Sequence, residues 1–297
     1  MLVKPSNQNL IIWLSFIFVC SLSACGGNES IPRTATLSSQ KPIGLSTDIA
    51  PTNKPESNSD QPTLSPIPIS QDCEVQTGSL EPFLITKDEV ELSGSIYKPP
   101  CYGSDPDQRY PSLYLFHGAT ATDQQWLDLG IADAADRLIA NSLIPPLIIV
   151  MPLELTWVAL PDNPFGDYLV KELVPWVDKN YRTLPDSDFR AIGGLSRGGN
   201  WAVRIGLLHW GMFGSIGAHS TPLFFGDLNR VQGWIEVIPS SRVPEIYLDI
   251  GQDDNNFEAA QEFREKLAEL DVPHAWNIEP GLHDEVYWSS HVDDYLL

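Results

Sequence analysis

The feature that most constrains the fold is the stretch of residues 189–199, in which an apolar run leads into Gly-Leu-Ser-Arg-Gly. A Gly-x-Ser-x-Gly sequence is typical of a sharp turn between a strand and a helix, which holds the serine hydroxyl above a parallel sheet. The two glycines let the strand and the helix approach each other without a clash of Cβ atoms. Downstream, Trp201, Ile205 and Leu208 recur with the spacing of an amphipathic helix. Strand, turn and helix are therefore all predicted around Ser196.

Strand-like and helix-like segments alternate on both sides of this motif. Apolar runs of strand length occupy residues 112–116, 147–151, 189–193, 214–218, 245–250 and 274–278. Most of them are too continuously apolar for one face to meet water, which is typical of a sheet covered on both sides. Helical periodicity appears in residues 169–181, where Pro175 is expected to bend the helix, and in residues 257–270. The pattern predicts an α/β fold with a mostly parallel central sheet, helices on both faces and ligands at the carboxyl ends of the strands.

The first 25 residues are similar to a bacterial lipoprotein signal. Lys4 supplies a weakly basic start, residues 10–19 form an apolar stretch too short for a comfortable membrane span, and Leu-Ser-Ala-Cys follows. The pattern predicts cleavage after residue 24 and lipid attachment at Cys25. The domain would then be exported and anchored to the bacterial membrane, on its extracytoplasmic or periplasmic side. An uncleaved anchor and an ordinary secretory signal are the alternatives, and both would also export the domain.

Composition divides the remaining chain into a tether and a folded domain. The 47 residues from 26 to 72 contain no aromatic side chain, and 20 of them are Pro, Ser or Thr. Such a segment buries too little apolar surface to offset the entropy of ordering it, so residues 25–72 are expected to form a lipidated, disordered tether. Residues 73–297 are expected to form the folded domain. It begins with two extended runs within residues 80–99, separated by a turn at 87–89, which predict a β-hairpin.

Cysteine usage agrees with export. Cys20 would leave with the signal and Cys25 would carry lipid, so Cys73 and Cys101 remain as an even pair in an oxidising environment. A disulfide between them is predicted. Their alternative use as metal ligands is not favoured, because no further ligands follow at the spacing of a zinc site, and no metal is expected.

The acidic balance of the chain bears on its partners. The formal net charge is −21, and no basic run or patch is visible in the sequence. A polyanion would be repelled, so nucleic acid is excluded as a partner. The simplest role of the charge is solubility.

A serine hydroxyl needs a base to take its proton, and the base needs a carboxylate to hold its tautomer. In this kind of fold the three residues follow the order Ser, acid, His. Of the six histidines, only His283 lies in a loop directly after the last predicted strand. For the acid, Asp253 and Asp254 both lie on the loop after residues 245–250, and Asp254 is preferred, in part because of the family resemblance given below. The alternative for either aspartate is that it caps the helix that begins near residue 257.

The charge that develops on the substrate during such a reaction needs two backbone N–H groups. Arg197, the residue after the serine, is expected to supply one of them from the start of its helix. Ala119, in the loop after the strand at residues 112–116, is expected to supply the other.

Five motifs occur in order: Leu-Phe-His-Gly at 115–118 followed by Asp123 and Trp126, Phe-Gly-Asp-Tyr-Leu-Val-Lys-Glu-Leu at 165–173, Gly-Leu-Ser-Arg-Gly-Gly at 194–199, Gly-Gln-Asp-Asp at 251–254 and Gly-Leu-His-Asp-Glu-Val-Tyr-Trp at 281–288. Together they resemble the putative esterase family of the α/β-hydrolases, which includes S-formylglutathione hydrolases, feruloyl and acetylxylan esterases, enterochelin esterases and mycolyltransferases. The resemblance spans residues 80–297 and implies the α/β-hydrolase fold. It implies Ser196 as nucleophile, Asp254 as acid and His283 as base, with no cofactor.

The chain departs from the family pattern at two positions. Arg197 stands where many members have Met or Phe, which leaves the backbone N–H in place but changes what the pocket can accept. Leu282 stands where a second glycine before the histidine is usual.

Substrate selectivity is expected to reside in two less regular stretches, residues 153–165 and 221–243. The candidate pocket residues are aromatic: Trp126, Trp157, Phe224 and Trp288. The alternative for such side chains is core packing under a long loop. The sequence thus predicts a serine esterase that acts through an acyl-enzyme on a small-molecule or carbohydrate-linked ester. An acyltransferase to a sugar hydroxyl and a non-catalytic binding lipoprotein remain as alternatives.

Overall fold

The computed structural model describes residues 77–87, 90–154 and 163–297. By its internal contacts the chain divides into two units, Met1–Asp60 and Gln61–Leu297, and all described residues lie in the second. The predicted signal, the tether, Cys25, Cys73 and Trp157 lie outside the described residues, so their roles stay predictions. Within the described part, none of the helices has the length and apolar character needed to cross a membrane.

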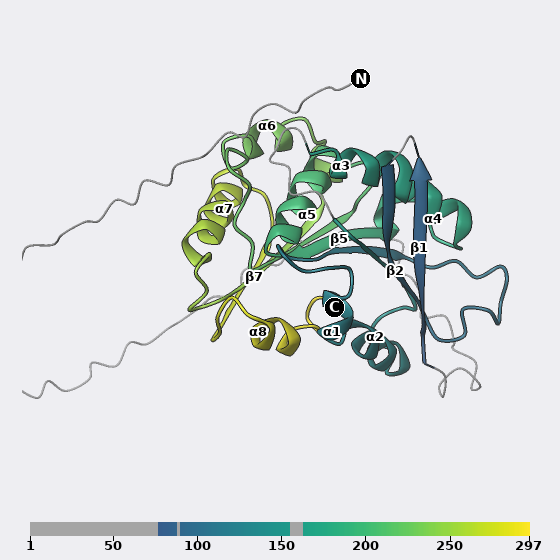
Figure 1. The fold of residues 1–297 in the computed structure, drawn as a ribbon. Helices are drawn as coiled ribbons and strands as arrows, with labels where there is room; N and C mark the ends of the chain where they lie inside the picture. Colours follow the sequence, from purple (N-terminus) through teal and green to yellow (C-terminus); the bar gives the residue numbers. More distant parts are fainter. Residues whose placement is uncertain (1–76, 88–89, 155–162) are drawn as a thin grey trace, which may run out of the picture. The chain divides into compact units, whose positions relative to one another are not determined.

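The described residues form an eight-stranded sheet in the order β1-β2-β4-β3-β5-β6-β7-β8 (Figure 1). Its strands are β1 (Ser79–Lys87), β2 (Val90–Lys98), β3 (Ser112–Phe116), β4 (Ile148–Pro152), β5 (Arg190–Leu195), β6 (Ser215–His219), β7 (Glu245–Gly251) and β8 (Ala275–Glu279). β1 pairs with β2 and β2 with β4 in antiparallel fashion, and all other pairs are parallel. The predicted hairpin followed by a mostly parallel sheet is confirmed.

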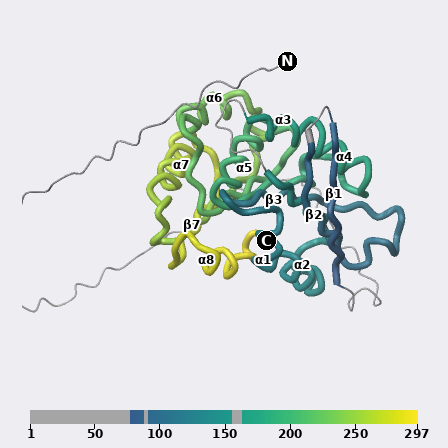
Figure 2. The backbone as a smooth tube through the Cα atoms, viewed as in Figure 1, coloured from purple at the N-terminus to yellow at the C-terminus, as the bar shows by residue number. Residues whose placement is uncertain are grey.

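Helices cover both faces of the sheet (Figures 1 and 2). One layer holds α1 (Gln125–Asp128), α2 (Ile131–Ala140) and α8 (Glu285–Ser290), and the other holds α3 (Phe165–Tyr168), α4 (Val174–Asn180), α5 (Arg197–Leu208), α6 (Val231–Ile235) and α7 (Phe257–Glu269). Two hydrophobic cores result, because successive residues of a strand point to opposite faces. Tyr114 of β3 packs in the core under α5, whereas its neighbours Leu113 and Leu115 pack in the core under α2. Burial on both sides accounts for the continuous apolar runs.

The helix type changes just ahead of Pro175, where the sequence predicts a bend. Residues Leu169–Leu173 form a π-helical stretch between α3 and α4, and Pro175 is the second residue of α4. Proline lacks a backbone N–H and tolerates the first helical turn, so a widened turn just ahead of it keeps the helix continuous. In the segment after β2, Cys101 is disulfide-bonded. Because Cys73 lies outside the described residues, its pairing with Cys101 stays a prediction.

Candidate active site

Ser196 lies at a strained turn between β5 and α5. Its backbone has φ 53° and ψ −117°, a left-handed conformation that is unfavourable for a residue with a Cβ atom. Its N–H donates to the carbonyl oxygen of His219 at 2.8 Å, which fixes the turn against β6. A Cβ atom on Gly198 would lie 2.1 Å from the carbonyl oxygen of Phe116, and one on Gly194 would lie 2.4 Å from Gly198. The two glycines of the motif are therefore required by close backbone packing, as the sequence predicted.

Three side chains meet above the carboxyl ends of the strands. The Nε2 atom of His283 lies 3.0 Å from the Oγ atom of Ser196. Its Nδ1 atom lies 2.9 and 3.0 Å from the two carboxylate oxygens of Asp254. A carboxylate only accepts hydrogen bonds, so Nδ1 carries the proton and Nε2 is left to accept the serine hydroxyl. The geometry is that of a nucleophile, a base and an orienting acid.

The structure distinguishes between the two candidate aspartates. Asp254 is only 4% exposed, and besides His283 it accepts the backbone N–H of Asn256 at 2.7 Å. Asn256 is the residue before α7, whose start has no side-chain cap, so Asp254 bonds within the preceding turn and the alternative prediction that it caps the helix is wrong. Asp253 is exposed, and its backbone N–H donates to Gly281 in the loop that carries the histidine.

The segment after His283 is held by buried polar contacts. Asp284 accepts the backbone N–H of Tyr287 at 3.0 Å and so caps α8. The indole N–H of Trp288 donates to Ser220 at 2.9 Å, and its ring meets the imidazole of His283 edge to face at 5.0 Å. Packing and hydrogen bonds at α8 therefore restrict the position of the imidazole.

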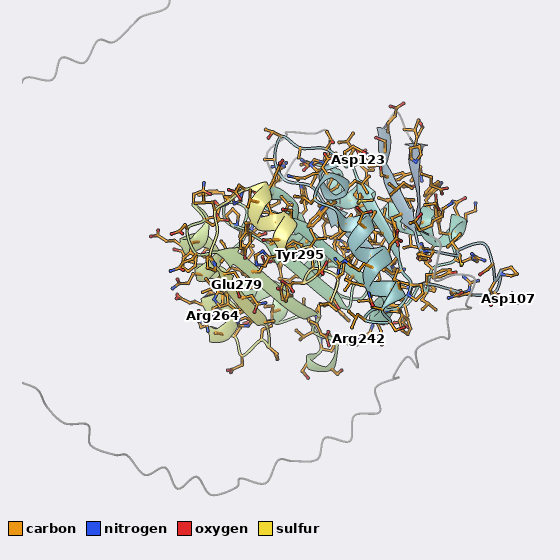
Figure 3. All side chains as sticks on the ribbon, turned by 90° about the horizontal axis from the view of Figure 1, so that it is seen from below. Asp107, Asp123, Arg242, Arg264, Glu279 and Tyr295 are labelled. Atoms are coloured by element: carbon orange, nitrogen blue, oxygen red, sulfur yellow. The ribbon has the colours of Figure 1, made fainter. Side chains whose placement is uncertain are left out.

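A second histidine–aspartate pair lies at the neighbouring strand ends. His219, the last residue of β6, bonds through Nδ1 to Asp249 of β7, which stands opposite it in the sheet. The other oxygen of this carboxylate accepts the hydroxyl groups of Tyr287 and Tyr295, at 3.1 and 3.2 Å (Figure 3 labels Tyr295 near α8). Burial, and then the nearby negative charge of Asp249, raise the pKa of both tyrosines. His283, not His219, contacts the serine hydroxyl. We therefore assign the pair of His219 and Asp249 a structural role, in which it ties the C-terminal segment to the sheet.

A buried carboxylate stands beside the residue that follows the serine. Glu154, two residues after β4, accepts two hydrogen bonds from the guanidinium of Arg197, at 2.7 and 3.0 Å. Its carboxylate also accepts the indole N–H of Trp201 at 2.9 Å and the side-chain amide of Asn163 at 3.0 Å. Only 7% of Glu154 is exposed, and this ring of donors compensates the burial of its charge.

Comparison with known proteins shows which family the chain resembles. A family model described as "Putative esterase" matches residues 160–296. Residues 160–296 of the chain are therefore similar to this family. Among similar proteins, an esterase of Mycobacterium tuberculosis is 30% identical, over 59% of this chain and 48% of that protein. An endo-1,4-beta-xylanase/feruloyl esterase of Xylanibacter ruminicola is 36% identical, over 41% of this chain and 18% of that protein. The chain thus spans about half the length, or less, of these curated relatives.

Solved structures agree on the fold of this domain. A ferulic acid esterase superposes with a TM-score of 0.67 at 25% identity, covering 74% of this chain and 96% of that one. An S-formylglutathione hydrolase of Staphylococcus aureus superposes with a TM-score of 0.60 at 15% identity, covering 74% and 98%. The second likeness concerns the fold alone.

The prediction that Trp126 and Trp288 line the substrate pocket is wrong. Trp126 is completely buried, and its indole N–H donates to the carbonyl of Phe116 at 3.0 Å. Trp288 is 6% exposed and packs beneath His283. Both belong to the core, which was the alternative considered from the sequence. Phe224 is half-buried and close to the serine turn, because its ring centre lies 5.2 Å from that of Trp201 and 5.4 Å from the Arg197 guanidinium.

The two predicted oxyanion donors, Ala119 and Arg197, lie on segments that contact each other. Ala119 lies three residues beyond β3 and is exposed, and Arg197 is the first residue of α5. The close approach of Gly198 to the carbonyl oxygens of Phe116 and His117 brings these two segments together. Their role as oxyanion donors stays a prediction.

A large hollow lies elsewhere on the domain. A groove of about 1410 Å³ runs along the sheet and is lined by Leu113, Gly193, Gly217, Tyr247 and Asn277, among others, but by none of Ser196, Asp254 and His283. It is therefore not the substrate site of the proposed chemistry.

Sequence reasoning missed Glu154, and it did not use Asp249. Glu154 follows an apolar strand, where an acidic residue carries no motif. The sequence places Asp249 inside a strand. Only the strand register, which sets Asp249 opposite His219, would have indicated that the two side chains meet.

Proposed function

We propose that this domain is a serine esterase that hydrolyses carboxylic esters through an acyl-enzyme. The observation that carries the proposal is the 3.0 Å contact between His283 Nε2 and Ser196 Oγ, with Asp254 on the other ring nitrogen. The match of residues 160–296 to the putative esterase family supports the same reaction class.

In the first half-reaction, the oxygen of Ser196 attacks the ester carbonyl while His283 takes the hydroxyl proton. The backbone N–H groups of Ala119 and Arg197 stabilise the negative oxygen of the tetrahedral intermediate. The intermediate expels the alcohol, which receives the proton from His283, and the acyl group stays on Ser196. A water molecule then attacks the acyl-enzyme with His283 as base, and the acid is released.

We propose esters of aromatic acids as substrates. Phe224 and the guanidinium of Arg197 lie against each other beside the serine turn, and together they offer a flat, polarisable wall. Relatives named as feruloyl esterases support this choice. The test compares kcat/KM for methyl esters of aromatic and short aliphatic acids. Equal or lower values for the aromatic esters would contradict it.

Replacement of the nucleophile tests the esterase function. Ser196→Ala is expected to lower p-nitrophenyl acetate hydrolysis more than about a thousandfold, with unchanged far-UV circular dichroism. Ser240→Ala, at an exposed serine in the short 3₁₀ turn Ser240–Arg242, serves as the control and should behave like the wild type. Undiminished hydrolysis by Ser196→Ala would refute the proposal. Product analysis with an added sugar acceptor separates hydrolysis from acyl transfer.

We also propose that the domain is exported and held at the bacterial membrane by a lipid on Cys25, as the Leu-Ser-Ala-Cys sequence indicates. The change Cys25→Ser should move the esterase from the membrane fraction to the soluble exported fraction. Mass spectrometry of the mature N-terminal peptide should find the lipid only in the wild type. An unmodified Cys25 in membrane-bound wild type would contradict the anchor.

A further inference from the structure

His117 is a buried residue that the esterase chemistry above does not use. It follows β3 and is 3% exposed. The backbone N–H of Glu154 donates to its Nε2 atom at 2.9 Å, and its Nδ1 atom lies 2.8 Å from the carbonyl oxygen of Gly118. An amide N–H can only donate, so Nε2 carries no proton. The imidazole is therefore the neutral tautomer with the proton on Nδ1, and it donates that proton to Gly118.

The carbonyl that His117 holds belongs to the peptide unit of the predicted oxyanion donor. The C=O of Gly118 and the N–H of Ala119 lie in one plane and point in opposite directions across a trans peptide bond. The N–H of Ala121 reaches the same oxygen at 3.3 Å, and the N–H of Gly118 donates to Gln125 at 2.8 Å. Fixing the oxygen fixes the direction of the Ala119 N–H. A hydrogen bond accepted by the carbonyl also polarises the peptide and strengthens its N–H as a donor.

Glu154 connects this peptide to the second predicted donor. Its backbone N–H sets the tautomer of His117, and its carboxylate holds the side chain of Arg197 in a bidentate ion pair. Residues on three separate segments, at the ends of β3, β4 and β5, are thus joined through one buried glutamate.

We propose that His117 and Glu154 are positioning residues for the oxyanion hole. His117, as the Nδ1–H tautomer, orients the peptide between Gly118 and Ala119. Glu154 fixes that tautomer and ties it to Arg197, the source of the other N–H. The inference rests on the proposed esterase function, because it assigns these residues a task in that reaction.

Two substitutions of His117 separate its two hydrogen bonds. His117→Asn places an amide N–H near the position of Nδ1 and keeps a donor for Gly118, whereas His117→Gln places its amide near Nε2 and loses that donor. We expect kcat on an aryl ester to fall at least tenfold further in His117→Gln than in His117→Asn. Loss of one oxyanion donor costs about 10²- to 10³-fold, which sets the upper limit. KM should change little in either variant.

Inhibition by a boronic acid gives a Ki that would not change if His117 had only a structural role. The tetrahedral adduct of the boronic acid with Ser196 places an oxygen where the oxyanion forms, so its Ki should weaken in proportion to the loss of kcat/KM across the variants. The matched control is His274→Asn, because His274 also bonds through Nδ1 to a backbone carbonyl, that of Val272, ahead of β8. It should keep the wild-type kcat and Ki.

The two proposals fail in different ways. If the wild type bound the boronic acid no better than Ser196→Ala, the esterase function itself would fail. If the wild type is active but His117→Asn and His117→Gln have equal kcat and Ki, the positioning role is overturned. Where a variant does not fold, ¹⁵N NMR of the wild-type imidazole decides. A protonated Nε2 at pH 7 would overturn the inference, and a proton on Nδ1 alone would support it.

Discussion

At the scale of single residues, two adjacent aspartates show how position decides chemistry. Asp254 is buried and shared between His283 and the turn that enters α7, while Asp253 points to solvent one residue earlier. A buried carboxylate that accepts the Nδ1 proton keeps Nε2 free to accept the serine hydroxyl, and it stabilises the imidazolium that forms during the reaction.

The change Asp254→Asn is expected to lower kcat about 10⁴-fold with little change in KM. An amide in place of the carboxylate favours the wrong tautomer of His283 and removes the charge that stabilises the imidazolium. Asp253→Asn is the matched control and should stay within about twofold of the wild type. Steady-state kinetics on p-nitrophenyl acetate measures both. Equal losses in the two variants would exclude Asp254 as the acid.

His117 makes the stability of the domain depend on pH. Burial, the largest cause, lowers its pKa, against the hydrogen bond to the Gly118 carbonyl and the nearby carboxylates of Glu154 and Asp123, which raise it. In the unfolded chain a histidine titrates near pH 6.5. As the pH falls below about 6.5, the unfolded chain takes up a proton that folded His117 does not, so the free energy of unfolding falls.

Urea unfolding at pH 7.5 and pH 5.5 tests this linkage. The wild type should lose more stability between these pH values than His117→Asn, by at most about 1.4 kcal/mol per pH unit. His274→Asn again serves as the control and should retain the wild-type difference. A pH dependence that is identical in His117→Asn and the wild type would contradict a neutral, buried His117.

At the scale of elements, the strand–turn–helix around Ser196 could be predicted because its glycines, apolar run and helical periodicity are all local. The order Ser, acid, His pointed to Asp254 and His283, and the structure brings both side chains to Ser196. Contacts between distant strand ends could not be predicted. The bond between Glu154 and Arg197 depends on how β4 and β5 are placed around β3, and the burial of Trp126 and Trp288 depends on which helix covers which core.

Because α5 packs closely against the end of β3, we expect alanine to change the free energy of unfolding in opposite directions at Gly198 and Gly233. Gly198→Ala would place a Cβ atom 2.1 Å from the carbonyl oxygen of Phe116, so the free energy of unfolding should fall by about 1 to 3 kcal/mol, and activity with it. Gly233→Ala lies in α6 with no atom within 4 Å of the new Cβ, and it should raise stability by up to about 1 kcal/mol. Urea unfolding of both variants checks the difference. A stable, active Gly198→Ala would contradict the close packing.

At the scale of the whole molecule, two cores on either face of one sheet support a site built entirely at the carboxyl ends of its strands. Ser196, Asp254 and His283 follow β5, β7 and β8, so the rigid sheet sets their mutual distances. The alternation of apolar runs was sufficient to predict this layered arrangement. The lipid anchor and the tether proposed for residues 25–72 concern where the domain works, and they leave the chemistry of the site unchanged.

The most direct test of the central claim is labelling with a fluorophosphonate, which reacts with an activated serine and loses fluoride. Intact-protein and peptide mass spectrometry should find one adduct, on Ser196. The adduct should be absent from Ser196→Ala and should form at least a hundredfold more slowly in Asp254→Asn than in Asp253→Asn. Labelling at another residue, or none in a folded wild-type domain, would contradict a triad of Ser196, His283 and Asp254.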